Sequence, residues 1–292
     1  MKWEPRALAT GLGFPEGPVY LGDGTVAFTE IRGQCVSIHD GDGYRVLART
    51  GGGANGATLG ADGALYIANN GGLSVGPGGY WFASDQIEGR IQRVTLDGAC
   101  DDVVATLPGD APHRPNDICF GPDGMLYFTD PRNWEHLSAL KPGRLWRAHP
   151  TTGAAEVIAE IPNFCNGVAF GPDPSKLYVA QSMAMAILEF DWTPDGVGEP
   201  RTFCTLPRGF PDGFCFAADG TLIVCGSMGD VLQVFDATGA LIQTIETGEG
   251  TEPTNCCLGV GELYVTMSGS GELVACDTEL EALPLFPARA SA

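Results

Sequence analysis

The sequence has few basic residues for its length. Its 292 residues contain 16 lysines and arginines against 36 aspartates and glutamates, which gives a formal net charge of −20 at pH 7. An acidic surface repels the phosphate backbone of nucleic acids and the headgroups of anionic lipids. The composition therefore argues against nucleic-acid and membrane partners, although most of these carboxylates are expected only to keep the surface solvated.

Long apolar runs and paired cysteines are also missing. No run reaches about 18 apolar residues, the length of a membrane-spanning helix, and the opening MKWEPRALATGLGF lacks the apolar core of a signal peptide. The ten cysteines are scattered without a C-x-x-C pair. In a chain of this length, free thiols are favoured over a disulfide framework, which predicts a reduced, cytoplasmic protein.

Glycine and proline, in contrast, are abundant, with 42 and 21 residues. Because these residues mark tight turns, the composition predicts many short strands joined by hairpins. Hydrophobic residues make up 44% of the chain, enough to exclude general disorder. No segment has a long 3.6-residue apolar period, and only residues 135–143 suggest a single helical turn.

Two sequence patterns alternate along the chain, and each occurs six times. The first has a small loop, an apolar run, a turn and a second apolar run, and spans 14–30, 53–69, 114–130, 165–181, 210–226 and 252–268. The second is a pair of alternating strands near 33–43, 89–98, 143–153, 186–196, 229–239 and 271–280. Two hairpins every roughly forty to sixty residues match one four-stranded blade. The sequence therefore predicts an all-β, six-bladed β-propeller that forms a single domain over residues 1–292.

Three segments lie outside the repeats. Residues 3–9 and 281–288 are short and strand-like, and we expect one of them to supply the missing outer strand of the last blade. Residues 70–88 are rich in glycine and carry the sequence Tyr80–Trp81–Phe82. We interpret this segment as an over-long loop that helps to shape a binding site.

The repeat places six equivalent residues at the start of the innermost strands, which line the central channel of a propeller. All six carry a side-chain oxygen, and they are Glu16, Asn55, Asn116, Asn166, Asp212 and Thr254. Two carboxylates among amide oxygens, without thiolate or imidazole, are what a hard divalent cation prefers. The ring therefore predicts one divalent metal site on the axis.

The competing interpretation is that these residues make local turn hydrogen bonds before a strand. For Asn55 and Thr254 both interpretations stay open. Glutamate is not a turn former, so the metal interpretation is favoured for Glu16, and it is favoured for Asn166 and Asp212 as well.

Four motifs in order and in register resemble the SMP-30/gluconolactonase/luciferin-regenerating-enzyme family. They are PEGPVY (15–20), RPND (114–117), NGVAF (166–170) and PDGF (211–214), and the resemblance covers nearly the whole chain. Each motif is weak alone, but the ordered set is specific. The resemblance implies a six-bladed propeller that binds one divalent ion.

Site residues follow from the resemblance position by position. Glu16, Asn166 and Asp212 match the metal ligands of the family, and Asn116 matches a residue that binds the metal or holds substrate beside it. Arg114 resembles the arginine that contacts substrate in sugar-lactone hydrolases. The choice among Ca, Mg, Mn, Fe(II) and Zn stays open.

These residues suggest hydrolysis of a small-molecule lactone. The metal polarises the carbonyl, water attacks, Asp212 is the candidate general base, and Arg114 and Asn116 hold the substrate. Four aromatic residues near the expected mouth would instead favour a more apolar lactone: Tyr80, Trp81, Phe82 and Trp134.

Other chemistries are less well supported. There is no G-x-S-x-G motif, and we interpret residues 226–229 as a turn. His39, His113, His136 and His149 have no metal-ligand spacing and are interpreted as exposed loop residues, although His113 and His136 fall near the mouth. The alternatives are an organophosphate-hydrolysing propeller, a non-catalytic calcium- or partner-binding propeller, and a strictosidine-synthase-like propeller without metal.

Overall fold

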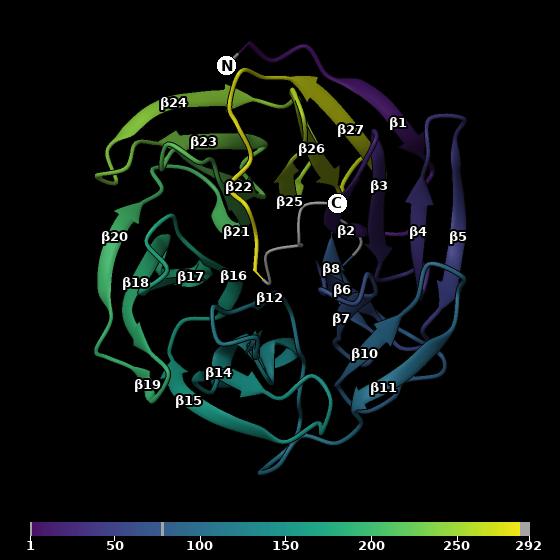
Figure 1. The fold of residues 1–292 in the computed structure, drawn as a ribbon, viewed down its shortest axis with the longest axis vertical. Coiled ribbons are helices and arrows are strands. Elements are labelled where there is room, and N and C mark those ends of the chain that lie inside the picture. Colours follow the sequence, from purple (N-terminus) through teal and green to yellow (C-terminus); the bar gives the residue numbers. More distant parts are fainter. Residues whose placement is uncertain (1, 77–78, 287–292) are drawn as a thin grey trace.

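The computed structural model describes residues 2–76 and 79–286, and in this part the chain forms six antiparallel sheets around a central axis (Figure 1). The innermost strands of successive sheets contact one another in sequence order, and the last contacts the first. The predicted six-bladed β-propeller is therefore confirmed.

Each blade is built from the centre of the ring to its rim. The strands of the first three blades, from inner to outer, are β2 (Pro15–Gly22), β3 (Thr25–Glu30), β4 (Cys35–His39) and β5 (Tyr44–Arg49); β6 (Ala54–Leu59), β7 (Leu65–Asn69), β10 (Arg90–Val94) and β11 (Cys100–Val104); β12 (Ile118–Phe120), β13 (Leu126–Asp130), β14 (Gly143–Ala148) and β15 (Ala155–Ile161). Those of the next three are β16 (Cys165–Phe170), β17 (Lys176–Gln181), β18 (Ala186–Thr193) and β20 (Arg201–Thr205), with the short β19 (Gly196–Val197) also on β18; β21 (Phe210–Phe216), β22 (Leu222–Ser227), β23 (Val231–Phe235) and β24 (Leu241–Glu246); β25 (Pro253–Leu258), β26 (Glu262–Met267), β27 (Glu272–Asp277) and β1 (Arg6–Thr10).

The N-terminal strand closes the ring. Strand β1 pairs antiparallel with β27, so that the first strand of the chain completes the blade formed by its last three. This confirms that a terminal segment supplies the missing outer strand, and it identifies that segment as the N-terminal one. The radial arrangement leaves only short, protected sheet edges, because every blade abuts two neighbours.

The hydrophobic core is divided among the gaps between blades. Six clusters of buried apolar side chains lie between successive blades, one in each gap. In the gap between the second and third blades, for example, Phe128 and Trp146 stack with their ring centroids 6.0 Å apart. Since both faces of each blade are covered, the strands read as nearly continuous apolar runs.

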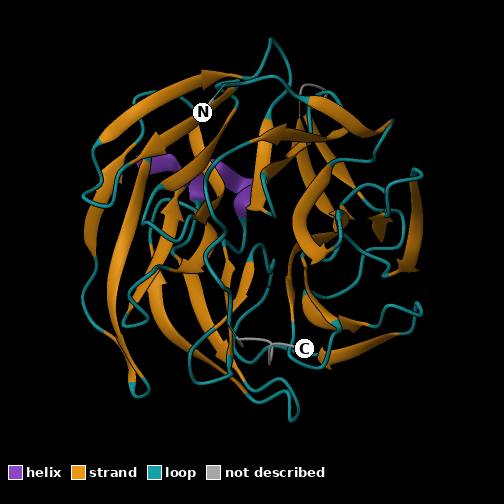
Figure 2. Ribbon diagram, turned by 45° about the horizontal axis from the view of Figure 1, so that its top comes forward, coloured by secondary structure: helices purple, strands orange, loops and turns teal. Residues whose placement is uncertain are grey.

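The two faces of the ring differ. The inner strands start at one face, here called the mouth face, and run to the other, the rear face. The 3-10 turns η1 (Trp134–Ala139) and η2 (Ser182–Ala184) connect second to third strands, so they lie on the mouth face. Residues 281–286 lie on the rear face, where the Ala218 amide donates to the Glu281 carbonyl. Figure 2 shows the helical turns and the C-terminal segment on opposite sides of the ring.

The insertion at 70–88 is not the irregular loop that we expected. It contains an antiparallel hairpin on the mouth face, made of β8 (Leu73–Gly76) and β9 (Gly79–Phe82). Its four residue pairs run from Leu73 and Phe82 to Gly76 and Gly79. Residues 77–78 of this segment lie outside the described part of the chain.

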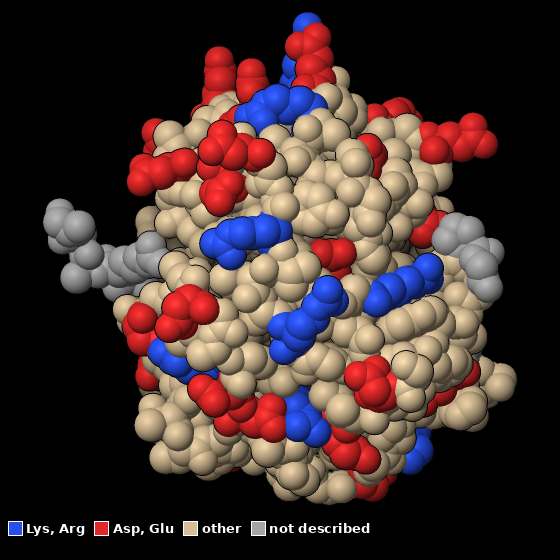
Figure 3. Space-filling view, turned by 90° about the vertical axis from the view of Figure 1, so that its right-hand side faces the viewer, with Lys and Arg blue, Asp and Glu red and all other residues tan. Residues whose placement is uncertain are grey.

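The outer surface carries interspersed charges. Over the flank formed by β5 and β11, acidic and basic side chains alternate with uncharged surface (Figure 3). Arg90–Asp102 is one such ion pair, with a distance of 2.7 Å. The described residues contain no helix long and apolar enough to cross a membrane.

Candidate functional site

Every inner strand carries a β-bulge close to its start, on the mouth side of the channel. In β21, for instance, Pro211 pairs with Gly226 and Phe214 with Val224, so Asp212 and Gly213 share a single opposing residue. The register shifts at or next to the equivalent position in the other five blades. A bulge redirects side chains relative to a regular strand. The residue that the repeat placed in the ring lies in the bulge or, as for Glu16, directly before it.

Hydrogen bonds between blades fix the backbone of this ring. The hydroxyl group of a residue on one blade donates to a backbone carbonyl at the start of the next inner strand, and the pairs are Thr29 to Asn55, Thr129 to Asn166 (2.6 Å), Ser182 to Pro211 (2.7 Å) and Thr254 to Pro15 (2.9 Å). The Thr254 hydroxyl is engaged in this way and with Thr266, so its hydrogen bonds join neighbouring blades and strands and are not local turn bonds.

The structure brings the two carboxylates of the ring together. Burial raises the pKa of Glu16 well above its ordinary value, and the charge of Asp212 raises it further. Burial, followed by the charge of Asp117, raises the pKa of Asp212 to about 8. The side chain of Asn166 hydrogen-bonds to Asp212 and stabilises its charged form. The channel thus concentrates negative charge that no basic side chain of the ring balances.

The donor set fits a hard divalent cation. Glu16 and Asp212 offer two charges, and Asn116 and Asn166 offer neutral amide oxygens from neighbouring blades. Among residues 2–76 and 79–286, no cluster of three or more histidine, cysteine, aspartate or glutamate side chains is arranged to hold a metal. A cation between the two carboxylates would need amide oxygens to complete its coordination, which calcium and similar ions accept.

Sequence reasoning missed three polar residues beside the ring. Asp117 follows Asn116 in the bulge of the third blade, and burial raises its pKa to about 6. Asn255 follows Thr254 at the same position in the sixth blade and is buried. Ser227, which we had interpreted as part of a turn, hydrogen-bonds to Asp212 from the end of β22. The one signal for the first two is that the other four blades have glycine at this position.

Arg114 is held beside the ring by a buried carboxylate. Its backbone amide donates to Asp130 Oδ1 at 2.8 Å, and the same oxygen accepts the Arg132 amide at 2.9 Å. The other oxygen of Asp130 lies 3.1 Å from His113 Nδ1 and 3.4 Å from Trp146 Nε1. His113 is therefore buried, not exposed as we expected, because it is part of this anchor. Asp130 is fully buried, and its carboxylate anchors the start of the loop that carries Arg114.

The side chain of Arg114 faces a carboxylate from η1. Arg114 Nη2 lies 3.4 Å from Glu135 Oε1, and both side chains are nearly buried. Arg114 Nε and Glu135 Oε2 have no hydrogen-bond partner within the described part of the chain. A buried donor and a buried acceptor without partners are costly unless a bound molecule satisfies them. They therefore mark a place where a polar ligand is expected.

Aromatic side chains lie next to this ion pair. Trp134 packs against Phe164 and Tyr80, with ring centroids 5.8 and 5.9 Å apart, and its carbonyl accepts a hydrogen bond from the Tyr80 hydroxyl at 3.2 Å. The hairpin β8–β9 thus contacts the loop that carries Glu135. Tyr80 and Phe82 remain exposed and extend the apolar surface outward.

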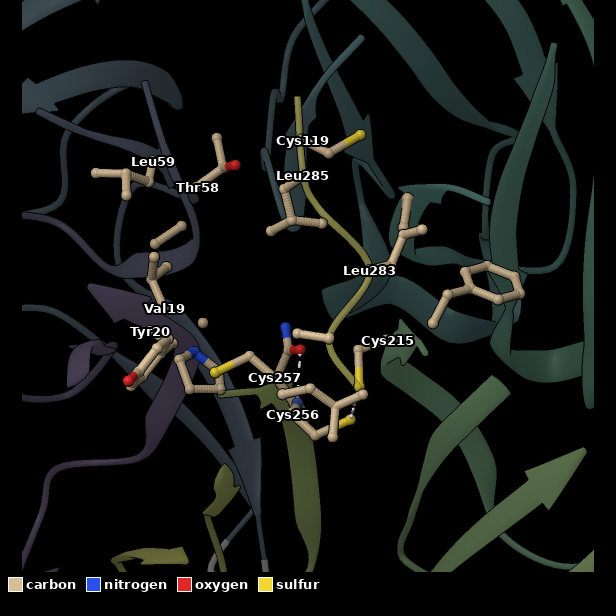
Figure 4. Close-up of a pocket in the computed structure, with 18 of the residues that line it drawn as sticks. Val19, Tyr20, Thr58, Leu59, Cys119, Cys215, Cys256, Cys257, Leu283 and Leu285 are labelled. Atoms are coloured by element: carbon tan, nitrogen blue, oxygen red, sulfur yellow. Dashed lines mark hydrogen bonds between the residues drawn. The ribbon is translucent and has the colours of Figure 1, made fainter. Parts of the chain in front are cut away.

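A cavity of about 490 Å³ occupies the rear half of the channel. It is lined by the later residues of the inner strands and by residues 282–286, and Figure 4 shows Leu283 and Leu285 facing Cys119, Cys215 and Cys256 across it. Asp117 and Asn255 lie at its inner end. The ring side chains and these two residues therefore separate the mouth from the rear cavity.

Two of the known proteins with related sequences are named as lactonases. Gluconolactonase of Zymomonas mobilis is 26% identical over 245 residues, which is 78% of this chain and 64% of that protein. L-arabinolactonase of Azospirillum brasilense is 28% identical over 180 residues, 60% of this chain and 58% of that protein. The chain thus spans less than two thirds of the length of these relatives.

Comparison of structures and family models agrees with the sequence matches. The structure of a gluconolactonase from Xanthomonas campestris superposes with a TM-score of 0.76 at 25% identity, covering 96% of this chain and 89% of the other. The model of the SMP-30/gluconolactonase/LRE-like region matches residues 14–269. Because this match covers most of the repeats and the whole ring of oxygen-bearing residues, the chain belongs to the SMP-30/gluconolactonase/LRE-like family.

Proposed function

We propose that this protein is a metal-dependent hydrolase of lactones. One observation carries the proposal: two buried carboxylates, Glu16 and Asp212, share a ring with amide oxygens beside Arg114, whose Nε is buried without a partner. The two carboxylates, which require a cation, are thus beside the Arg114 N–H donor, which requires a hydrogen-bond acceptor from a ligand. The lactonases among the relatives of this chain support the same conclusion.

The residues of the chain have distinct tasks in this proposal. A divalent ion held by Glu16, Asn166, Asp212 and Asn116 would polarise the lactone carbonyl and stabilise the oxyanion. Arg114 orients the substrate through its free Nε, and its position is fixed by Asp130. Asp212 is the candidate acceptor of the proton from the attacking water, because it and Glu16 are the two carboxylates of the ring.

The mouth favours a lactone that carries hydroxyl groups. Glu135 Oε2 accepts from a hydroxyl and Arg114 Nε donates to one, and neither atom has a partner in the described chain. The faces of Trp134 and Tyr80 offer apolar surface for the C–H side of the ring. We therefore propose an aldonolactone as the substrate class. The exposed aromatic residues then serve as one wall of the site and do not by themselves require an apolar substrate.

The proposal is tested by hydrolysis of aldonolactones and of unsubstituted γ- and δ-lactones in a pH-indicator assay. Chelator-stripped protein is compared with protein to which Ca²⁺, Mg²⁺, Mn²⁺, Fe²⁺ or Zn²⁺ is added back. We expect metal-dependent turnover, faster with the hydroxylated lactones. Tight binding of an ion without turnover of any lactone would instead identify a cation-binding propeller and refute the hydrolase.

Replacing Arg114 with lysine is expected to raise KM for an aldonolactone about 10- to 100-fold and to change metal affinity little. Lysine keeps the charge but loses the planar donor group that matches Glu135 and the substrate together. Arg147 on β14, which is half-buried and paired with Glu156, provides the matched control in Arg147→Lys. Equal kinetics of the Arg114 and Arg147 variants would exclude a role of Arg114 in substrate binding.

A further inference from the structure

Two blades depart from the rule that a glycine follows the ring residue of the inner strand. The residue after the ring residue is Gly17, Gly56, Gly167 and Gly213 in four blades, but it is Asp117 in the third blade and Asn255 in the sixth. Both exceptions are polar, and both lie between the ring and the rear cavity. This position forms a second layer directly behind the ring of candidate metal ligands.

The glycines leave the space that these two side chains fill. A Cβ atom on Gly213 would overlap Cγ and Oδ1 of Asn255 and lie 2.5 Å from its Nδ2. A Cβ atom on Gly56 would lie 2.5 Å from Asp117 Oδ1. The backbone of one blade thus makes room for the side chain of the next. Packing this close fixes both side chains without a choice of rotamer.

The orientation of the Asn255 amide follows from its hydrogen bonds. Its Oδ1 accepts the backbone N–H of Cys256 at 2.8 Å, so its NH₂ group must point away from β25. There it hydrogen-bonds to the carboxylates of both Glu16 and Asp117, and these bonds favour their charged forms. The backbone of Asn255 is held as well, because its N–H donates to Thr266 Oγ1 at 3.1 Å.

We infer that Asn255 is a positioning residue for the metal site. Its side-chain amide holds the Glu16 carboxylate in place, and the absence of a side chain at Gly213 leaves the space that this amide occupies. The inference rests on the proposed function, since it assumes that Glu16 is a ligand. Asp117 is the second residue of this layer, and its Oδ2 accepts the Val168 amide at 3.0 Å from the adjacent blade. The layer thus links the third, fourth, sixth and first blades behind the ion.

The test uses Asn255→Gly, which introduces the residue that four blades already have at this position. The glycine removes the amide and keeps a backbone that the fold tolerates in the equivalent places. We expect the Kd for Mn²⁺, measured by isothermal titration on chelator-stripped protein, to rise about 10- to 100-fold, as for other residues that orient metal ligands. Excess Mn²⁺ is expected to restore turnover with an unchanged KM.

Gly213→Ala provides a second variant that acts through the same contact. Alone, its methyl group displaces the Asn255 amide and is expected to weaken Mn²⁺ binding to a similar extent. In the Asn255→Gly background it is expected to change the Kd little, because the three atoms nearest to the added Cβ all belong to the Asn255 side chain. Two unrelated losses of stability would not make the effects on the Kd non-additive in this way. Thermal unfolding of each variant measures its stability separately.

The outcomes separate the inference from the proposed function. If wild-type protein binds no divalent ion, the proposed metal site is wrong. If wild-type protein binds Mn²⁺ and Asn255→Gly binds it equally well, only the positioning role of Asn255 is overturned. A lower unfolding temperature with unchanged Mn²⁺ affinity also overturns it, since that result means that Asn255 serves the fold alone.

Discussion

Asp212→Asn is expected to lower kcat for lactone hydrolysis about a thousandfold at saturating metal. The substitution keeps the size of the side chain and removes its charge, so the ring loses one of two anionic donors and the water loses its proton acceptor. Loss of a positioned general base costs about 10²- to 10⁴-fold in rate. The measurement is turnover of an aldonolactone at rising Mn²⁺ concentration, with bound metal quantified in parallel.

Glu16→Gln distinguishes the loss of an anionic metal ligand from the loss of the proton acceptor, both of which occur in Asp212→Asn. It removes the other anionic donor but no proposed base, so we expect weaker Mn²⁺ binding and recovery of most activity when the ion is in excess. Asp219→Asn is the matched control for Asp212→Asn. Asp219 lies on the same blade as Asp212, in the exposed turn after β21, where its Oδ1 accepts the Thr221 amide. Full turnover of Asp212→Asn with metal bound would falsify the assignment of the base.

The ring itself was predictable because a repeated bulge leaves a repeated sequence pattern. An oxygen-bearing residue follows the same loop in all six units, and the structure places these residues at the same point of each inner strand. The closing strand was predictable for a similar reason, since a short strand was missing from the last repeat. Both features depend on local sequence and on the symmetry of the fold.

The second layer was not predictable, because it depends on contacts between different blades. Asn255 faces Glu16 where the last blade meets the first. The two residues are 239 positions apart in the sequence. The pairing of Arg114 with Glu135 depends on how η1 folds over the mouth, and the burial of His113 depends on Asp130. No pattern along the sequence encodes these distances.

Removal of the divalent ion is expected to make the stability of the protein fall as pH rises from about 4 to about 8. Burial raises the pKa of Asp117 to about 6 and that of Asp212 to about 8, and Glu16 is also raised. The folded state therefore holds protons that the unfolded state has released. Below about pH 4 these groups are protonated in both states and do not lower the free energy of unfolding. Above their folded-state pKa values the loss of stability is complete.

The ion should reverse this loss by pairing with the same carboxylates. At about a thousand times its Kd it adds roughly 4 kcal/mol to the free energy of unfolding, which raises the unfolding temperature of a chain of this size by roughly 10 °C. The measurement is thermal unfolding between pH 5 and pH 8, with chelator or with saturating Mn²⁺. The largest difference between the two conditions is expected at pH 8.

Asp212→Asn serves here as the variant that isolates the ring from the remaining carboxylates of the chain. It removes the carboxylate whose pKa is raised to about 8 and relieves the repulsion on Glu16. Metal-free Asp212→Asn is therefore expected to unfold at a higher temperature than metal-free wild type at pH 8, and the difference should shrink towards pH 5. Mn²⁺ should stabilise the variant less than wild type. If both proteins show the same pH dependence without metal, the charge that destabilises the apo form lies outside the ring, and the case for a cation between Glu16 and Asp212 loses its electrostatic basis.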